Sequence, residues 1–339
     1  MRHVVQDAAG ADIVFSAGTT GEWDKVDNAT RQGVIRVCAE EVDKLNLSLA
    51  SPLTGSAGPQ SQGVEHWAGV TAPTAADTLA NLEFAIECGV DAAVIAPLSI
   101  EGVSDPVRFM LRDVADLLDA HARRIPIFLY DNADIAIDPK VPHIRTKQVK
   151  AMSRLDFVRG IKVSASNKVL GNYTRAAKNF KDRGEFGIYI GNAKLIFDIY
   201  RPHHGMLGTI QSHWDRWRRS GGLPVGVVSG PANAMPREWA FAWQVCRAGD
   251  EERMQQAQDI ADAFRTSTTM PSGKRPTLAC LKRALLTEGV ISSDCVAEGT
   301  PSLSAEDAKR FDEAFEGVKS LAANTIGASW LTQFERRIG

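Results

Sequence analysis

A lysine stands within the apolar, β-branched stretch "FVRGIKVSA" of residues 157–165, a pattern that predicts a buried strand. Burying an ammonium group costs free energy unless the charge is paired or the amine is neutral. A neutral lysine amine can attack a carbonyl carbon, and the resulting iminium draws electrons from the adjacent carbon, which permits C–C cleavage or β-elimination. Lys162 is therefore the first candidate catalytic residue, and a salt-bridged structural lysine is the alternative.

Two further motifs could complete such a site. "LYDN" at 129–132 ends the preceding strand, so the Tyr130 phenol could lie beside Lys162 and shuttle protons. "SAGTTGE" at 16–22 ends another strand, and there Thr19 and Thr20 offer hydroxyls and consecutive N–H groups that suit a carboxylate. Taken alone, Tyr130 also fits a core aromatic residue, and the threonine pair also fits an ordinary turn.

Apolar segments alternate with amphipathic ones along the first 250 residues. Strands are predicted at 11–18, 66–72, 91–98, 125–131, 157–164, 186–191 and 223–230. Helices are predicted at about 24–44, 74–89, 105–123, 144–153, 167–182 and 236–247. Strands that are apolar on both faces are typical of a parallel sheet covered by helices. The pattern therefore predicts an α/β fold, with a (β/α)₈ barrel as the first candidate and a doubly wound open sheet as the second.

Three regions interrupt or follow this alternation. Residues 46–63 are rich in Ser, Gly and Pro and are interpreted as a loop. Residues 201–222 are interpreted as an insertion, and residues 215–220 within it as a solvated or subunit-contact loop. After about residue 250 only helices are predicted, at 251–265, 276–288 and 304–322. We therefore expect a barrel catalytic domain over 1–250 and a C-terminal helical extension over 251–339.

Composition limits the classes of partner. The 339 residues carry a formal net charge of -2 and include five widely spaced cysteines without a CxxC pair. This favours a cytoplasmic protein with reduced thiols and without affinity for nucleic acid or membrane, although "DRWRRS" at 215–220 mixes arginine with tryptophan. We expect no metal site, because the adjacent His203 and His204 would face different ways, and no cofactor.

Three motifs in one order and spacing suggest a family. GTTGE at 18–22, the strand-end Tyr130 and GIK at 160–162 make the chain resemble the dihydrodipicolinate synthase / N-acetylneuraminate lyase family. The similarity extends from about residue 9 to residue 313 and includes "GDEERMQQAQ" and "KRPTLACLKRALLTEG" near the C-terminus. The resemblance implies class I aldolase chemistry on a (β/α)₈ barrel.

The resemblance also implies roles for single residues. Lys162 would form a Schiff base with a 2-oxo acid, and Tyr130 would relay protons. Thr19 and Thr20 would hold the substrate carboxylate, with Thr20 linked to the Tyr130 hydroxyl. Gly191 would line the pocket through its backbone. A homo-oligomer, dimer or tetramer, is expected on the same ground.

The chain departs from the family's pattern at several positions. Ile135 stands where dihydrodipicolinate synthases carry an arginine, and Leu98 and Ser99 follow Pro97 in place of tyrosines. The family's first strand is also missing from the predicted barrel. Polar groups that could donate or accept hydrogen bonds to a hydroxylated substrate tail stand near the strand ends instead: Ser99, Asp131, Asn132 and Ser164.

These observations predict a Schiff-base lyase, an aldolase or a dehydratase, that acts on a 2-oxo acid such as a 2-keto-3-deoxy sugar acid. One alternative is a catalytically silent barrel that binds a sugar acid as a sensor or scaffold. The other is dihydrodipicolinate synthase itself.

Overall fold

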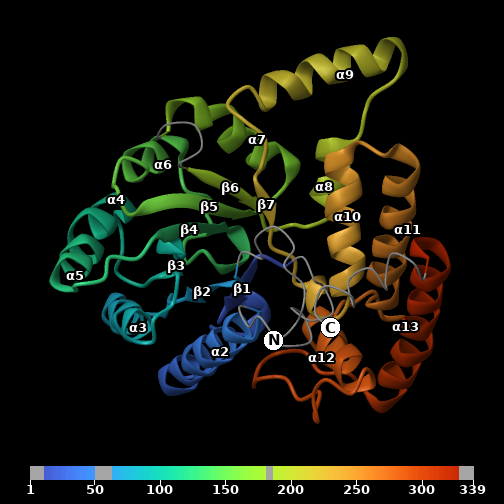
Figure 1. The fold of residues 1–339 in the computed structure, drawn as a ribbon, viewed down its shortest axis with the longest axis horizontal. Helices are drawn as coiled ribbons and strands as arrows, with labels where there is room; N and C mark the ends of the chain where they lie inside the picture. The colour runs from blue at the N-terminus through green and yellow to red at the C-terminus, as the bar shows by residue number, and fades with distance from the viewer. Residues whose placement is uncertain (1–10, 50–62, 181–185, 328–339) are drawn as a thin grey trace. The chain divides into compact units, whose positions relative to one another are not determined.

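The computed structural model describes residues 11–49, 63–180 and 186–327 of the chain. Within these residues, seven strands form one parallel sheet whose members follow one another in chain order (Figure 1). The strands are β1 (Ile13–Ser16), β2 (Glu65–Gly69), β3 (Ala92–Ile95), β4 (Ile127–Asn132), β5 (Val158–Ser164), β6 (Gly187–Ile190) and β7 (Gly226–Val227).

Helices separate most of these strands and continue after the last one. They are α2 (Asn28–Leu49), α3 (Ala75–Glu87), α4 (Pro106–Phe109), α5 (Ala115–Ala120), α6 (Thr146–Met152), α7 (Asn167–Ala176), α8 (Leu195–Tyr200), α9 (Gly205–Arg218), α10 (Pro236–Ala248), α11 (Glu251–Ser267), α12 (Thr277–Thr287) and α13 (Ala305–Ile326). A π-helical turn joins α4 to α5. Several helices begin at capping side chains, because Thr74, Asp105 and Ser166 each accept a first-turn backbone N–H.

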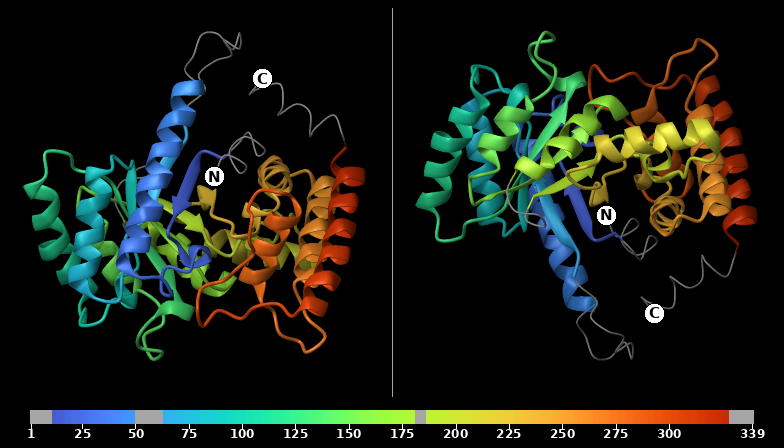
Figure 2. Two further views of the ribbon diagram at one scale, coloured as in Figure 1. Left: turned by 90° about the horizontal axis from the view of Figure 1, so that it is seen from below. Right: turned by 90° about the horizontal axis from the view of Figure 1, so that it is seen from above.

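The sheet has one face covered by helices and one face that encloses an aromatic core. Helices α2 to α7 lie along the outer face in Figure 1 and in both views of Figure 2. On the inner face Trp67 stacks on Phe128 with ring centroids 3.7 Å apart, and Tyr189 meets both rings edge-on. Chain-order parallel strands with helices outside form a (β/α)₈ barrel that, within the described residues, is without its first strand, as the sequence predicted.

The segment 201–222 differs from its prediction, because α9 occupies most of it as a helix rather than a loop. No proline interrupts residues 205–218, and the segment packs against α7. The Thr174 hydroxyl donates to the Arg218 carbonyl at 3.0 Å, and the Arg175 guanidinium lies 4.3 Å from the centre of the Trp217 ring. His203, which precedes α9, bonds Asp215 near the end of this helix at 2.8 Å.

Contacts group the described residues into two compact units. One unit holds the sheet and comprises the described residues of 13–42 and 65–228, and the other comprises the described residues of 11–12, 43–64 and 229–327. These groupings do not test the predicted division into functional domains at residue 250, which stays a prediction. The predicted loop at 46–63 lies mostly outside the described residues, although α2 extends to Leu49. None of the described helices is both long and apolar enough to cross a membrane.

Candidate active site

Strands β4 and β5 bring two of the predicted catalytic residues together. In their parallel register Tyr130 pairs with Lys162, and Asn132 pairs with Ser164. Because alternate residues of a strand share one face, all four side chains belong to the inner face near the carboxyl ends of the two strands. This is the end at which (β/α)₈ barrels carry their active sites.

The Lys162 amine lies between two aromatic rings. Its Nζ is 4.5 Å from the centre of the Phe15 ring and 4.3 Å from the centre of the Tyr130 ring. Among the residues that the structure describes, no carboxylate forms an ion pair with it. The residue as a whole is only partly buried, but the amine is enclosed, and the surroundings of the amine decide its charge.

Desolvation by burial lowers the pKa of Lys162 from 10.5 to about 7. Contact with aromatic faces acts in the opposite direction, since it favours the cation. The loss of hydration is the larger effect, so much of the amine is neutral near pH 7. A neutral lysine amine is the form that attacks a carbonyl.

We expect the reactivity of Lys162 to follow this pKa. When the protein is labelled with trace acetic anhydride across a range of pH, acetylation of Lys162 should rise with a midpoint near pH 7 and level off above it, because only the neutral amine reacts. Peptide mass spectrometry measures the labelling, and Lys150, exposed on α6, provides the internal reference for reagent decay. A Lys162 profile that still rises steeply above pH 9 would contradict the desolvated amine.

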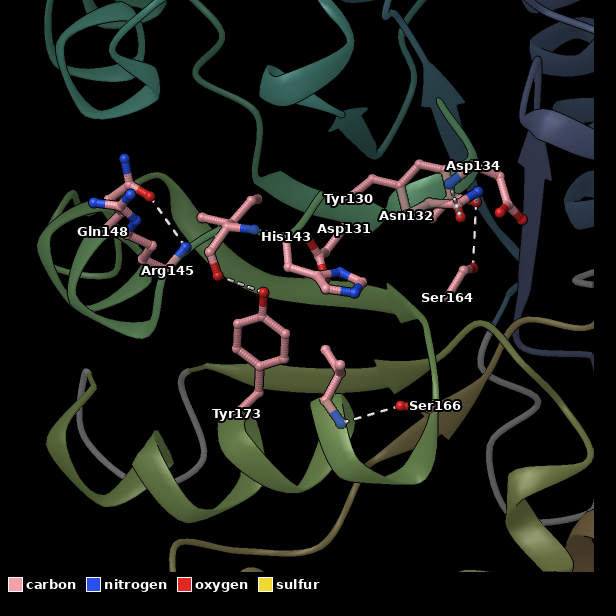
Figure 3. Close-up of polar contacts among 12 residues, drawn as sticks. Tyr130, Asp131, Asn132, Asp134, His143, Arg145, Gln148, Ser164, Ser166 and Tyr173 are labelled. Atoms are coloured by element: carbon pink, nitrogen blue, oxygen red, sulfur yellow. Dashed lines mark hydrogen bonds and ion pairs between the residues drawn. The ribbon is translucent and has the colours of Figure 1, made fainter. Parts of the chain in front are cut away.

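The Tyr130 hydroxyl is the centre of a hydrogen-bond network. Thr19 Oγ1 lies 3.1 Å from it, Ser164 Oγ lies 3.3 Å from it, and Asn132 Nδ2 donates to it at 3.1 Å. Figure 3 shows Tyr130, Asn132 and Ser164 drawn together from the ends of β4 and β5. A phenol with bonded neighbours on several sides can both give and receive a proton, which is what a relay requires.

The structure corrects the identity of the threonine that contacts Tyr130. The resemblance assigned this link to Thr20, whereas Thr19 makes it and Thr20 forms no side-chain hydrogen bond within the described residues. Both threonines belong to the short 3₁₀ turn η1 (Thr19–Gly21), in which consecutive side chains point about 120° apart, so only one can face Tyr130. Ala17 (φ 49°) and Glu22 (φ 54°) flank this turn in left-handed conformations that are costly for residues other than glycine.

Gly191 lies directly against Ser164. A Cβ at position 191 would lie 2.0 Å from Ser164 Oγ and 3.0 Å from Ser164 Cα, so a larger residue cannot fit without movement of β5. The Gly191 N–H also donates to the Val163 carbonyl at 2.8 Å. The predicted pocket residues Gly191 and Ser164 are thus neighbours at the end of the sheet.

Asp131 was a candidate for binding a substrate tail, but its side chain lies on the opposite face of β4. It is 1% exposed, accepts from the Ile144 N–H at 2.8 Å and bonds His143 Nδ1 at 2.9 Å (Figure 3). The Tyr173 hydroxyl donates to the Ile144 carbonyl in the same cluster. Burial raises the pKa of Asp131 despite these bonds. The residue therefore fixes the segment after β4 to α7 and does not face Lys162.

Two contacts of the site were missed in the sequence. Phe15, one of the two rings at the Lys162 amine, occupies an alternate, inward position of the first predicted strand and could have been found from that periodicity. The bond from Asn132 to Tyr130 joins residues two apart on one strand. Same-face spacing permits such a bond but does not predict it.

A scan against protein-family models finds no match to this chain, and a search of curated proteins finds none either. Solved structures do match. Dihydrodipicolinate synthase from Bacteroides thetaiotaomicron superposes with a TM-score of 0.70 at 18% identity, covering 93% of this chain and 90% of that chain. YagE, a prophage protein of the dihydrodipicolinic acid synthase family from E. coli K12 solved in complex with pyruvate, gives 0.65 at 16% identity, with 93% and 90% covered. KD(P)GA from T. tenax gives 0.64 at 18% identity, with 94% and 92% covered.

The molecule is thus a parallel α/β barrel with a desolvated lysine and a hydrogen-bonded tyrosine at the carboxyl ends of adjacent strands. Its fold is that of the dihydrodipicolinate synthase family, which confirms at the level of structure the resemblance carried by the GTTGE, Tyr130 and GIK motifs.

Proposed function

We propose that this chain is a lyase that forms a Schiff base between Lys162 and a 2-oxo acid. The neutral amine attacks the C2 carbonyl carbon, and the carbinolamine that forms then loses water to give an iminium. Tyr130 supplies and removes the protons that these steps need, with Thr19 as its relay partner. In an aldolase the C4 hydroxyl loses its proton, the C3–C4 bond breaks to release an aldehyde, and the iminium accepts the electron pair as an enamine. In a dehydratase the C3 proton leaves to give the enamine, which then expels the protonated C4 hydroxyl as water. Protonation of the remaining enamine in the aldolase, and hydrolysis of the imine by water in both cases, free Lys162 and the 2-oxo acid product.

One observation carries this proposal. The nitrogen of Lys162 lies 4.5 and 4.3 Å from the centres of the Phe15 and Tyr130 rings rather than beside a carboxylate, and its pKa is lowered to about 7. A structural lysine in a strand would be expected to have an acidic partner, because an unpaired buried charge is costly. The Tyr130 hydroxyl on the neighbouring strand supports the proposal, because imine formation requires a proton donor close to the amine.

The side chains around the site favour a substrate with a neutral, hydroxylated tail, such as a 2-keto-3-deoxy sugar acid. Ile135 packs its apolar side chain against the inner core cluster that includes Tyr130, where a cation would be needed to bind a carboxylate tail. Ser164 offers a hydroxyl close to Tyr130, and Ser99, at the end of the turn after β3, is a further neutral candidate. Thr19 and Thr20 remain our proposed ligands for the substrate's own carboxylate.

Trapping tests the proposed function directly. The protein is incubated with pyruvate, or with each member of a panel of 2-keto-3-deoxy acids, and is then reduced with borohydride. We expect the mass of one reduced adduct, located at Lys162 by peptide mass spectrometry. An adduct at another lysine, or no adduct with any 2-oxo acid, would refute the Schiff-base mechanism, whereas an adduct without turnover would favour the silent sensor.

Condensation of pyruvate with aspartate semialdehyde separates the branches of the fold family. We expect this reaction to be at least ~10²-fold less efficient in kcat/KM than cleavage or dehydration of the best 2-keto-3-deoxy acid. A tail carboxylate without charge-assisted hydrogen bonds loses several kcal/mol, and each ~1.36 kcal/mol is tenfold in rate. A coupled assay for the condensation product measures this kcat/KM. Efficient condensation would show that the chain is a dihydrodipicolinate synthase.

A further inference from the structure

Asn132 donates a hydrogen bond to the Tyr130 oxygen, yet it lies two residues further along the same strand and has no part in the mechanism above. Its side chain is nearly buried, at 9% exposure. We propose that Asn132 is a positioning residue that fixes the direction in which Tyr130 passes its proton. This inference rests on the proposed function, since it assigns a role within the same site.

The orientation of the Asn132 amide follows from a second hydrogen bond. Asn132 Oδ1 accepts from the backbone N–H of Asp134 at 3.1 Å, where Asn132 caps the turn η5 (Ala133–Ile135) (Figure 3). Turning the amide over would place its NH₂ group against that N–H donor and leave both without an acceptor. The NH₂ group must therefore point at Tyr130, as a donor only.

A donor at this place determines what the Tyr130 proton can do. One lone pair of the phenol oxygen accepts from Asn132, so the O–H bond must point elsewhere, to Thr19 Oγ1 at 3.1 Å or Ser164 Oγ at 3.3 Å. These two hydroxyls are the proposed contacts to the substrate. When Tyr130 gives up its proton, the Asn132 N–H group also stabilises the negative oxygen through a charge-assisted bond.

The ionisable groups around the pair are few and come from several elements. Lys162 on β5 lies over the Tyr130 ring, and Tyr189 on β6 pairs in register with Lys162. Glu22 ends the turn that carries Thr19, and Asp134 follows the Asn132 cap. Asp131 lies on the other face of β4. A new carboxylate at position 132 would thus be the acid nearest to the phenol along this strand.

The experiment compares Asn132→Asp with Asn132→Ala by the rate of imine formation with pyruvate, trapped with cyanoborohydride between pH 5 and pH 8. An ionised carboxylate keeps the turn cap but accepts the phenol proton, so Asn132→Asp should lower the rate by ~10-fold at pH 8. Because burial raises the pKa of a carboxyl group, the rate of this variant relative to wild type should recover as the pH falls toward 5 and the carboxyl becomes a donor again. Asn132→Ala should lose a similar factor without recovery, and Asn167→Asp on α7 is the control that should change nothing.

A second readout needs no substrate, so it separates failure of this inference from failure of the proposed function. The tyrosine Raman doublet reports whether a phenol donates or accepts, and subtracting the spectrum of Tyr130→Phe isolates the signal of Tyr130. Asn132→Asp should move this signal toward that of a strong donor at pH 8. An unchanged Raman signal, or parallel pH profiles in both Asn132 variants, would overturn the role of Asn132. If the wild-type protein forms no adduct, but the Tyr130 Raman signal still shifts in Asn132→Asp, only the proposed function would be overturned.

Discussion

Lys162→Ala should abolish the covalent adduct with pyruvate and lower turnover of the best 2-oxo acid by ~10⁴-fold or more, the scale on which loss of a covalent nucleophile is measured. No other lysine is expected to substitute, because the reaction needs an amine that is both desolvated and beside Tyr130. Steady-state kinetics and intact-protein mass spectrometry measure the two effects. Lys168→Ala, on the exposed side of the first turn of α7, is the matched control and should behave as wild type.

Measuring the stability of Lys162 variants shows whether a loss of activity comes from the lost amine or from failure to fold. The pKa of Lys162 is lowered from 10.5 to about 7 in the folded chain, so between these values the unfolded state binds more protons and stability rises with pH. Lys162→Met removes the cost of holding the amine, so its stability relative to wild type should be highest below pH 7, fall as the pH rises, and become independent of pH above about pH 10. Retained activity in the alanine variant, or an adduct on it, would show that Lys162 is structural.

Tyr130→Phe should keep the fold and the ring beside Lys162 but lower kcat by about 10³-fold, within the range for loss of general acid–base catalysis. KM should change little, because the ring contact to the amine at 4.3 Å stays and only the hydroxyl is lost. Imine formation should be slowed, since loss of water from the carbinolamine needs a proton donor. Stopped-flow kinetics of imine formation and steady-state turnover measure these effects.

Tyr200→Phe is the matched control for this prediction. Its hydroxyl donates to the Pro224 carbonyl at 3.2 Å, so the variant loses a hydrogen bond of similar kind without touching the site. It should lose at most ~1 kcal/mol of stability and keep wild-type kcat. Equal kcat values in Tyr130→Phe and wild type would show that Tyr130 only packs in the core and takes no part in proton transfer.

The sequence predicted those parts of the site that depend on strand order. Apolar runs separated by helical segments indicated a parallel sheet, and in such a sheet neighbouring strands end side by side. The pairing of Tyr130 with Lys162 follows directly from that rule. The fold could be predicted for the same reason, since seven strands in chain order leave few arrangements.

Other parts depend on backbone geometry that the sequence does not encode locally. The choice of Thr19 over Thr20 is set by a turn whose flanking residues, Ala17 and Glu22, take left-handed conformations that residue type does not signal. The direction of Asp131 is set by β4 alternation together with partners in a later segment. Helix α9 lies in the segment interpreted from the sequence as an insertion, for which the family resemblance supplied no template.

The contact between Gly191 and Ser164 restricts how this site can diversify. Shortening Ser164 to alanine would remove its hydroxyl, but a Cβ at position 191 would still lie 3.0 Å from both the Cα and the Cβ of residue 164. A side chain at 191 therefore cannot be gained by any single substitution, nor by the simplest pair, without displacing strand backbone. Mutational routes to new substrate ranges, in natural drift or in directed evolution, are therefore favoured at other positions near the carboxyl ends of the strands, and Ser99 and Ile135, which follow other strands, are the first to randomise.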